Sequence, residues 1–277
     1  MENPAKINDA RYSKSPSRDL GVYFADLHIH SCLSPCGDLD MSPRHIVRIA
    51  KEKGLDMIAI TDHNSTRNVQ TCVEIGQKNG IFVIPGCEVA TQEEVHCLAY
   101  FPDMQATNAF QRYLDEYLPH VKNDPSVFGY QVAVDENDTI IYEEDKLLIM
   151  GLNQDIEAIS KKVSELGGIF VPAHIDKAKN SIFSQLGFIP FDLKYDALEI
   201  SRHTTPENFL KLHPELAEKR FLRSSDAHYP QDIASVHTSL MMERLNWEGF
   251  KKVLNAPFAI PKSEIPNPKS QIPQWLI

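Results

Sequence analysis

The sequence lacks any apolar stretch of the roughly 18–20 residues that a helix needs to cross a bilayer. Its first thirty residues contain no apolar core of the kind found in signal peptides, since residues 3–21 are polar throughout. Cysteine is also scarce, since the chain has five, an odd number. A disulfide framework is therefore not expected, and a reducing cytoplasm without membrane contact is the predicted location.

Positive charge is the next shortage. The formal net charge is −10, and lysine and arginine form no cluster longer than a pair. A protein that holds nucleic acid mainly by neutralising phosphates needs such clusters, so the composition argues against nucleic acid as a partner. A small phosphorylated substrate stays compatible with this charge, because bound cations would reverse the local field.

Several well-known catalytic motifs are missing as well. No GxxxxGK[ST] phosphate loop occurs, and no GxGxxG follows a strand-like run. The GxSxG turn of the α/β-hydrolases is absent. Cys32 and Cys36 have no second cysteine pair with which to complete a structural zinc site. Nucleotide binding through such loops and serine-based hydrolysis are therefore not indicated.

The 277 residues contain an alternation of strand-like and helical patterns. Short apolar runs, typical of strands buried on both faces, lie near 22–30, 55–61, 81–87, 95–101, 168–175, 195–201 and 221–226. Helical patterns separate many of them, and this alternation implies a parallel sheet. Seven strands with polar chemistry at their ends predict an α/β fold, a distorted (β/α)7 TIM-like barrel.

Three segments stand outside the barrel pattern. Residues 1–20 are predicted to form a flexible N-terminal arm before the barrel domain at 21–255. Residues 104–150 are an insertion between the fourth and fifth strands, with one helix and a β-hairpin, and are expected to overhang the pocket. The tail at 256–277 carries five prolines and should run extended, and its apolar end could dock on the body or on another copy.

Histidines and acids recur where these apolar runs meet polar loops. Six of the eleven histidines and three acids do so, in the segments FADLHIH, TDH, PGCE, VHCLAYF, FVPAH and SSDAH. Each alone has an ordinary reading as a polar strand end or a hydrogen-bonded core histidine. His28 and His30, two residues apart on a strand, point to the same side of the pleat. If the strand ends converge, so many imidazoles and carboxylates in one pocket require cations to hold them together, which predicts a multinuclear metal site.

The ordered set DLHIHS, TDHN, PGCE, VHCLAYF, PAHID and SDAH resembles the polymerase and histidinol phosphatase (PHP) superfamily over residues 22–230. The resemblance implies a distorted seven-stranded barrel that holds two to three divalent cations (Zn, Mn or Fe) and hydrolyses phosphate esters. It also implies a ligand set. One cation would take His28, His30 and Asp226, and Glu88 would bridge it to a second cation held by His96 and His174.

A third cation would take His63 and His228, with one more ligand from the loop SCLSPCGDLDM. This loop departs from the family pattern. Asp38 is the favoured ligand because it offers a hard oxygen, whereas a thiolate from Cys36 would suit zinc and Asp40 follows slightly late.

Four further residues are candidates for supporting roles. Arg202 could clamp a phosphate and His203 could protonate the leaving oxygen, although an exposed loop pair is an equal reading. Lys177 is another candidate for the phosphate. Asp62 could orient a ligand histidine or simply cap the following loop.

The predicted function is hydrolysis of a small phosphomonoester or nucleotide through a metal-bridged hydroxide. The alternatives are an exonuclease-like phosphodiesterase, a histidinol-phosphate phosphatase, a metal-binding module without catalysis, and an amidohydrolase-like enzyme that cleaves C–N bonds.

Overall fold

The computed structural model describes residues 20–256. The predicted N-terminal arm and the proline-rich tail therefore lie outside the described residues, apart from Leu20 and Ala256, and the idea that the tail supports an oligomer stays a prediction. No helix among the described residues is long and apolar enough to span a membrane.

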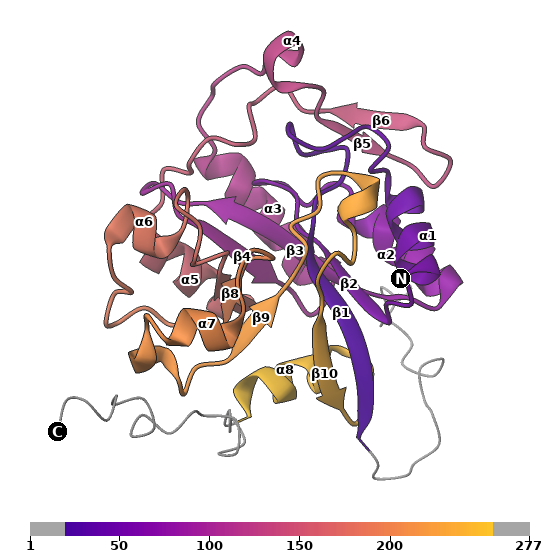
Figure 1. The fold of residues 1–277 in the computed structure, drawn as a ribbon. Helices are drawn as coiled ribbons and strands as arrows, with labels where there is room; N and C mark the ends of the chain where they lie inside the picture. The colour runs from indigo at the N-terminus through magenta and orange to yellow at the C-terminus, as the bar shows by residue number, and fades with distance from the viewer. Residues whose placement is uncertain (1–19, 257–277) are drawn as a thin grey trace, which may run out of the picture.

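Ten strands and eight α-helices alternate along the described chain (Figure 1). The strands are β1 (Gly21–Ile29), β2 (Met57–Ile60), β3 (Phe82–Ala90), β4 (His96–Tyr100), β5 (Val132–Val134), β6 (Ile140–Glu143), β7 (Ile169–Pro172), β8 (Leu198–Ile200), β9 (Phe221–Arg223) and β10 (Thr238–Met242). The helices are α1 (Pro43–Glu52), α2 (Val69–Asn79), α3 (Met104–Tyr117), α4 (Pro125–Phe128), α5 (Ile156–Glu165), α6 (Ile182–Leu186), α7 (Pro206–Leu210) and α8 (Trp247–Asn255).

The strands curl into a distorted barrel, which confirms the predicted fold class. Six of them form one sheet in the order β10-β1-β2-β3-β4-β7, and β8 pairs with β9 in parallel. The two sheets meet at both edges. The amide of Ile175 donates to the carbonyl of Glu199 at 2.9 Å, and a parallel bridge joins Ile29 to Ala227. The seven strands expected from the sequence are β1, β2, β3, β4, β7, β8 and β9.

One of these strands departs from the expected parallel arrangement. β1, β2 and β3 are parallel neighbours, but β4 runs antiparallel to both β3 and β7. The reason is the short connection at residues 91–95, since a parallel crossover needs about a dozen residues or more. The start of β4 therefore lies at the same edge as the end of β3, which places His96 beside the carboxyl ends of the other strands. The additional strand β10 pairs antiparallel with the first half of β1.

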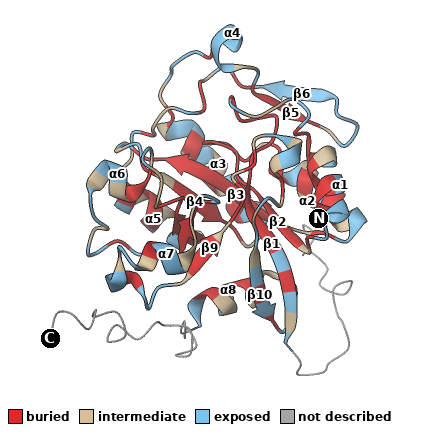
Figure 2. Cartoon of the chain, in the orientation of Figure 1, coloured by how far each residue is buried: buried red, intermediate tan, exposed pale blue. Residues whose placement is uncertain are grey.

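The helices follow local capping signals that are readable in the sequence. Ser42 caps α1 by accepting a hydrogen bond from the amide of His45, and Pro43 occupies the first turn. α2 ends at Gly80, which adopts the left-handed conformation that glycine tolerates best. The buried faces of α1 and α2 pack against the strands, which form the buried centre of the molecule (Figure 2).

The insertion between β4 and β7 contains α3, α4 and the hairpin β5–β6. β5 is tied to the loop after β1, because the amide of Val132 donates to the carbonyl of Cys32 at 3.2 Å. Asn68 donates to Val132 and accepts from Val134, and the side chain of Asn64 donates to the carbonyl of Leu148 at 2.7 Å. The insertion thus rests on the loops that follow β1 and β2, whereas β6 is exposed along its whole length (Figure 2).

Candidate metal centre

Six histidines and two acids from six different segments meet at one edge of the barrel. All of them are buried or half-buried: His28 and His30 on β1, His63 after β2, Glu88 on β3, His96 on β4, His174 after β7, and Asp226 and His228 after β9. The convergence follows from the topology, because the carboxyl ends of β1, β2, β3, β7 and β9 and the start of β4 share this edge.

Glu88 lies at the centre of this cluster, and only 1% of its surface is exposed. Its two carboxylate oxygens are within 3.3 Å of five imidazoles, those of His28, His30, His63, His96 and His174. The shortest approach is 3.0 Å, from Nδ1 of His63 to Oε2. The surrounding imidazoles outweigh the effect of burial and hold the pKa of Glu88 well below its usual range, so the carboxylate is ionised.

Asp226 closes the cluster from the opposite side. Its Oδ1 lies 3.4 Å from Nε2 of both His28 and His30, and the ammonium of Lys177 contacts its Oδ2. Burial opposes ionisation of Asp226, but His28 and His30 overcome it and keep its pKa well below the usual value. Two ionised carboxylates therefore flank the pair of imidazoles on β1.

The tautomers of the β1 pair are fixed from behind. Nδ1 of His28 lies 3.0 Å from Oε2 of Glu199, a buried carboxylate that can only accept when ionised. Nδ1 of His30 lies 2.9 Å from Oγ of Ser34, whose own proton goes to Asp62 at 2.8 Å. Both Nδ1 atoms are therefore donors, and the lone pair of each Nε2 points into the cluster.

These two Nε2 atoms are only 3.1 Å apart. Two facing lone pairs at that distance repel each other unless a cation or a proton lies between them. The arrangement is therefore the one expected of two imidazoles that bind the same metal ion. In the metal-free chain a proton takes this place. Burial disfavours charge on His28, but Glu199, Glu88 and Asp226 more than compensate and hold its pKa well above the usual value. The residues present thus fit a divalent cation.

The imidazoles of His63 and His228 are neutral near pH 7, so each offers a lone pair to a cation. Burial lowers the pKa of His63 to about 4 and, together with nearby His30, lowers that of His228 to about 3. Nδ1 of His63, although close to Glu88, makes no hydrogen bond with any described residue, and the same is true of Nδ1 of His174. Buried polar atoms without partners are costly in a protein interior, so they too indicate that cations belong here.

Three groups of ligand atoms are compact enough to hold one ion each, since within each group the atoms lie within 4.8 Å of one another. The groups are His28, His30 and Asp226; His63, Glu88 and His96; and His30, His63 and His228. The first repeats the ligand set expected for one cation. In the third group His30 stands beside the expected His63 and His228.

The backbone is strained at two of these positions. Asp226 has a φ of 52° and His174 a φ of 30°, in the left-handed region that residues with a side chain rarely adopt. Such conformations cost about 1–3 kcal/mol and persist at functional sites, where the surrounding structure imposes them. Here they turn an imidazole and a carboxylate into the cluster from loops that leave β7 and β9.

Two contributors to the site were not identified from the sequence. Glu199 holds His28 and also accepts from the backbone amide of His174 at 3.0 Å. Ser34 connects Asp62 to His30, so Asp62 orients a ligand histidine through an intervening hydroxyl. A signal for Glu199 exists in hindsight, since it is an acid inside a fully buried apolar strand, β8. Ser34 has no such signal.

The loop after β1 places Asp38 near His228, because the amide of Asp38 donates to the carbonyl of His228 at 2.9 Å. Its carboxylate accepts from the amide of Asp40 at 2.8 Å, and neither acid belongs to the three compact groups. Desolvation and the nearby Glu88 carboxylate raise the pKa of the Cys36 thiol to about 12, which disfavours a thiolate in the metal-free chain. The choice among the three residues stays a prediction.

The candidate substrate-handling residues divide into two kinds. Lys177 reaches the cluster, where it contacts Asp226. Arg202 and His203 are exposed, and the guanidinium of Arg202 lies 3.1 Å from Oδ1 of Asp232. His203 and Lys177 line the same cavity beside the cluster. Their roles toward a substrate stay predictions.

Comparison with known proteins places these features in a family context. The PHP domain family profile matches residues 26–248. Endonuclease Q of Pyrococcus furiosus has a similar fold, with a TM-score of 0.66 and 21% identity over 85% of this chain and 56% of that one. A candidate metal-dependent phosphoesterase of Bifidobacterium adolescentis superimposes with a TM-score of 0.53 and 19% identity, over 83% of this chain and 95% of that one.

Among curated proteins, an uncharacterized protein of Methanocaldococcus jannaschii is 38% identical over 77 residues, which are 25% of this chain and 45% of the relative. A phosphoribosyl 1,2-cyclic phosphate 1,2-diphosphodiesterase of Eggerthella lenta is 29% identical over 68 residues, 24% of this chain and 25% of the relative. The aligned segments thus span less than half of either curated relative, and this chain covers just over half of endonuclease Q.

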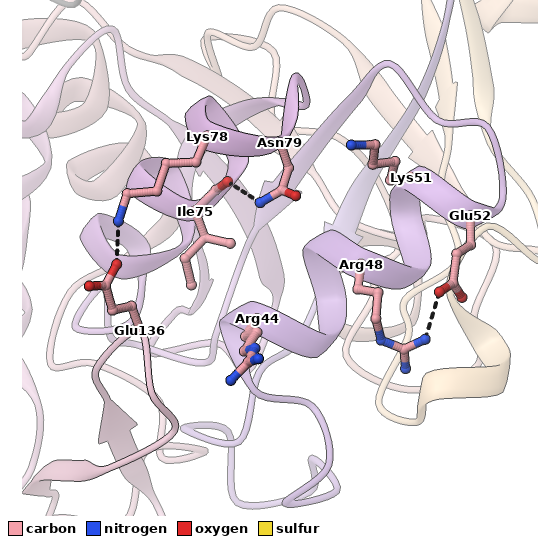
Figure 3. A pocket seen from close by; sticks show the side chains of 8 residues that line it. All are labelled: Arg44, Arg48, Lys51, Glu52, Ile75, Lys78, Asn79 and Glu136. Atoms are coloured by element: carbon pink, nitrogen blue, oxygen red, sulfur yellow. Dashed lines mark hydrogen bonds and ion pairs between the residues drawn. The ribbon is translucent and has the colours of Figure 1, made fainter.

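The prediction drawn from net charge, which argued against nucleic acid as a partner, is wrong. A second endonuclease Q structure, with a TM-score of 0.64 and 22% identity over 84% of this chain and 56% of that one, contains a 27-mer duplex substrate with an abasic lesion. The overall charge misleads because charge is not spread evenly. A cavity of about 370 Å³ between α1 and α2 is lined by Arg44, Arg48, Lys51 and Lys78 (Figure 3). Only Arg48 and Lys78 have acidic partners among its walls, namely Glu52 and Glu136.

Proposed function

The chain belongs to the PHP domain family, and on this premise we propose that it hydrolyses a small phosphomonoester or a nucleotide with two to three divalent cations, Zn, Mn or Fe. The observation that carries the proposal is the pair of imidazoles on β1. Their Nε2 atoms face each other at 3.1 Å, and each ring is oriented from behind by an acid, directly or through Ser34. Such an arrangement is unfavourable in a core without metal, and it orients both imidazoles to bind a cation.

Bound cations would supply the polarisation of phosphoryl oxygens and the activation of water that phosphate-ester hydrolysis requires. The protein side chains then have distinct tasks. Glu88 and Asp226 neutralise cationic charge from two sides, while Glu199 and Ser34 hold the β1 imidazoles in one tautomer. Lys177 is placed to bind a phosphoryl oxygen at the rim. His203 protonates the leaving oxygen from the exposed side.

The test is metal content measured together with hydrolysis. The full chain, stripped with a chelator and reloaded with Zn, Mn or Fe, should retain at least two equivalents by elemental analysis. It should then release phosphate from at least one member of a panel of sugar phosphates, nucleotides and histidinol phosphate. His120→Gln, a change at an exposed histidine outside the cluster, serves as the matched control. No recoverable metal, or metal without release of phosphate from any ester, would contradict the proposal.

For the third cation we propose Asp38 as the additional ligand, since its backbone is already tied to His228. Asp38→Ala should lower the metal content by one equivalent, and Cys36→Ser should leave it unchanged. The reverse pattern would assign the role to the thiol of Cys36. If neither change affects the metal content, Asp40 is the next residue to substitute.

A second candidate function is cleavage of a nucleic-acid phosphodiester. The observation that favours it is the cationic surface between α1 and α2, where Arg44 and Lys51 have no acidic partner among the cavity walls (Figure 3). The double change Arg44→Ala and Lys51→Ala should slow cleavage of an oligonucleotide and reduce its salt dependence, without changing rates on monoesters. Equal rates for both proteins on oligonucleotides would remove this surface from consideration.

We further propose a cytoplasmic location. All five cysteines are free, and four of them are buried among apolar neighbours, which suits a compartment that keeps thiols reduced.

A further inference from the structure

A second cavity lies beside the cluster and holds none of its ligands. It has a volume of about 550 Å³ and is formed by the loop after β7 with α6 and by the loop after β8 with α7. This volume falls within the roughly 300–1,000 Å³ of small-molecule pockets, and it exceeds what a phosphoryl group alone would fill. Lys177 lines the cavity and also contacts Asp226, so the cavity opens next to the place where a phosphoryl group would bind.

The two loops are fixed to each other at this boundary. Asp176 accepts hydrogen bonds from the amide of Ser201 at 2.7 Å and from its hydroxyl at 2.6 Å. Lys177 follows Asp176 directly, and His203 comes two residues after Ser201, with its own amide bonded to the Ser201 hydroxyl. Lys177 and His203, which both line the cavity, thus lie on two loops that are hydrogen-bonded to each other. The shape of the cavity is therefore fixed by the structure of the barrel edge.

The wall away from the cluster is aromatic and apolar. His213 stacks against Phe183, with ring centroids 4.7 Å apart and planes 24° apart, and against Phe209, with values of 4.5 Å and 21°. Leu212 lines the same cavity, although 79% of its surface is exposed. A cluster of aromatic rings with an uncovered apolar side chain beside it suits a planar ligand, because aromatic faces gain most from stacked neighbours.

The polar atoms of the cavity suit a ligand with one charged end. The ammonium of Lys177 lies on the side of the cluster. Thr204 and Asn208 supply uncharged hydrogen-bonding groups elsewhere on the wall. A charged phosphate at one end and an uncharged, ring-bearing body at the other would match this distribution.

We propose that this cavity binds the organic part of the substrate, and that this part carries a planar ring of the size of a nucleobase. The phosphoryl group is then directed past Lys177 toward the cluster, and the ring lies along His213 and Leu212. The inference rests on the proposed function, which it narrows from phosphate esters in general to esters of ring-bearing alcohols such as nucleosides. It also assigns the selection of substrate to α6, α7 and their loops, at a distance from the metal ligands.

The experiment uses substrates that differ only in the ring. Each of the four common ribonucleoside 5′-monophosphates is compared with ribose 5-phosphate, which has the same phosphorylated sugar and no base. With the metal-loaded full chain, at least one nucleotide should have a KM about tenfold or more below that of ribose 5-phosphate. Leu212→Ser and His213→Ala should each raise the KM for that nucleotide about threefold to tenfold, the range of one lost stacking or apolar contact. The KM for ribose 5-phosphate should stay unchanged.

Met241→Ser, at an exposed apolar residue on β10, is the matched control and should change neither KM. Binding of the four unphosphorylated nucleosides, measured by equilibrium dialysis, is independent of catalysis. At least one nucleoside should bind the wild-type chain, and Leu212→Ser should weaken that binding. If no phosphate is released from any ester but a nucleoside binds in this way, the proposed function fails and the cavity assignment survives. No preference for any nucleotide over ribose 5-phosphate, or a preference that both cavity variants retain, would overturn the assignment.

Discussion

Two groups of titratable side chains meet at the edge of the barrel, and they are built in opposite ways. The ligand candidates on β1 and β3 are almost fully buried, with exposed fractions of 0–1% for His28, His30 and Glu88. The cationic candidates on the loops after β7 and β8 are open to water, and about a third of each side chain is exposed for Lys177 and Arg202. The first group is held by hydrogen bonds on several sides, whereas Arg202 has one exposed ion pair.

The contrast teaches how the tasks are divided. Burial strengthens electrostatic interactions and fixes the orientation of side chains, which is what a metal centre requires. Exposed loops can change sequence without disturbing a core, so they suit the choice of substrate. If this division is right, substitutions in the buried group should abolish or weaken metal binding. Substitutions in the loops should change affinity for the substrate and leave the metals in place.

The largest effect is expected for Glu88→Gln. This change keeps the shape of the side chain but removes the negative charge that faces five imidazoles. The metal content should fall by at least one equivalent, and kcat/KM should drop by about 10³-fold or more, since several kcal/mol of charge stabilisation are lost. Elemental analysis and steady-state kinetics measure both. Full metal occupancy in the variant would show that Glu88 is not a bridge.

A smaller loss is expected for Glu199→Gln, which replaces the carboxyl group behind His28 without changing a candidate ligand atom. Substitutions of this kind typically lower metal affinity about 10–100-fold. Competition with a chelator, measured by titration, gives the affinity. Glu165→Gln, at an exposed position at the end of α5, is the control. If both variants bind metal equally well, the contact between Glu199 and His28 has no part in holding the cation.

The metal-free chain should lose stability as the pH falls from 6.5 to 5. The pKa values of His63 and His228 lie near 4 and 3 in the folded chain, below the ordinary value of 6.5. The unfolded chain therefore takes up protons in this window and the folded chain does not, which costs about 2 kcal/mol per histidine at pH 5. Two groups offset part of this loss. His28 has a raised pKa and is charged in the folded chain throughout the window, and burial raises the pKa of Asp26 to about 6, so the folded chain takes up a proton there that the unfolded chain does not.

Denaturant unfolding at several pH values tests this expectation, with His228→Gln as the informative variant. That change should flatten the dependence of the unfolding free energy on pH by about half or more between 6.5 and 5, because it removes one of the two histidines that cause the loss. An unchanged slope would mean that His228 is protonated in the folded chain.

The smallest effect is expected for Arg202→Ala, in the exposed group. Exposed ion pairs contribute about 0.2–1 kcal/mol, and Asp232 already competes for this guanidinium. The KM should rise about threefold, with kcat and metal content unchanged, if Arg202 binds phosphate before the reaction. Arg112→Ala, at an exposed position on α3, is the control. A fall in kcat with KM unchanged would place the contact in the transition state and weaken the division between the two groups.

The fold and the buried group could be predicted from the sequence more completely than the exposed group. Runs such as GIFVPAH combine a buried strand with a terminal histidine, so both the strand and the position of its polar end could be predicted. The direction of β4 was less accessible, because it depends on five connecting residues and not on the composition of the strand. His96 begins its strand where the other ligands end theirs, and in an all-parallel sheet it would stand at the wrong edge.

Other features could not be predicted because they depend on partners far away in the sequence. The role of Glu199 depends on closure of the barrel, which brings its side chain to His28, a residue 171 positions away in the sequence. The wrong prediction about nucleic acid had a similar origin. Net charge sums over the whole surface of the protein, whereas a partner contacts only one part of that surface. Arg44 and Lys51 on α1 share one cationic surface with Lys78 on α2 only because the two helices are adjacent.

The closure of the barrel between Ile29 and Ala227 has a consequence for how the protein is made. Chains are synthesised from the amino terminus, so His28 and His30 emerge long before Asp226 and His228 can meet them. Contacts between such distant segments also form slowly, because the entropy cost of closing a long loop comes before any stabilising contact is made. A growing chain thus carries an incomplete set of metal-binding side chains until β9 has left the ribosome. Loading of the full complement of metal is therefore among the last steps of its maturation.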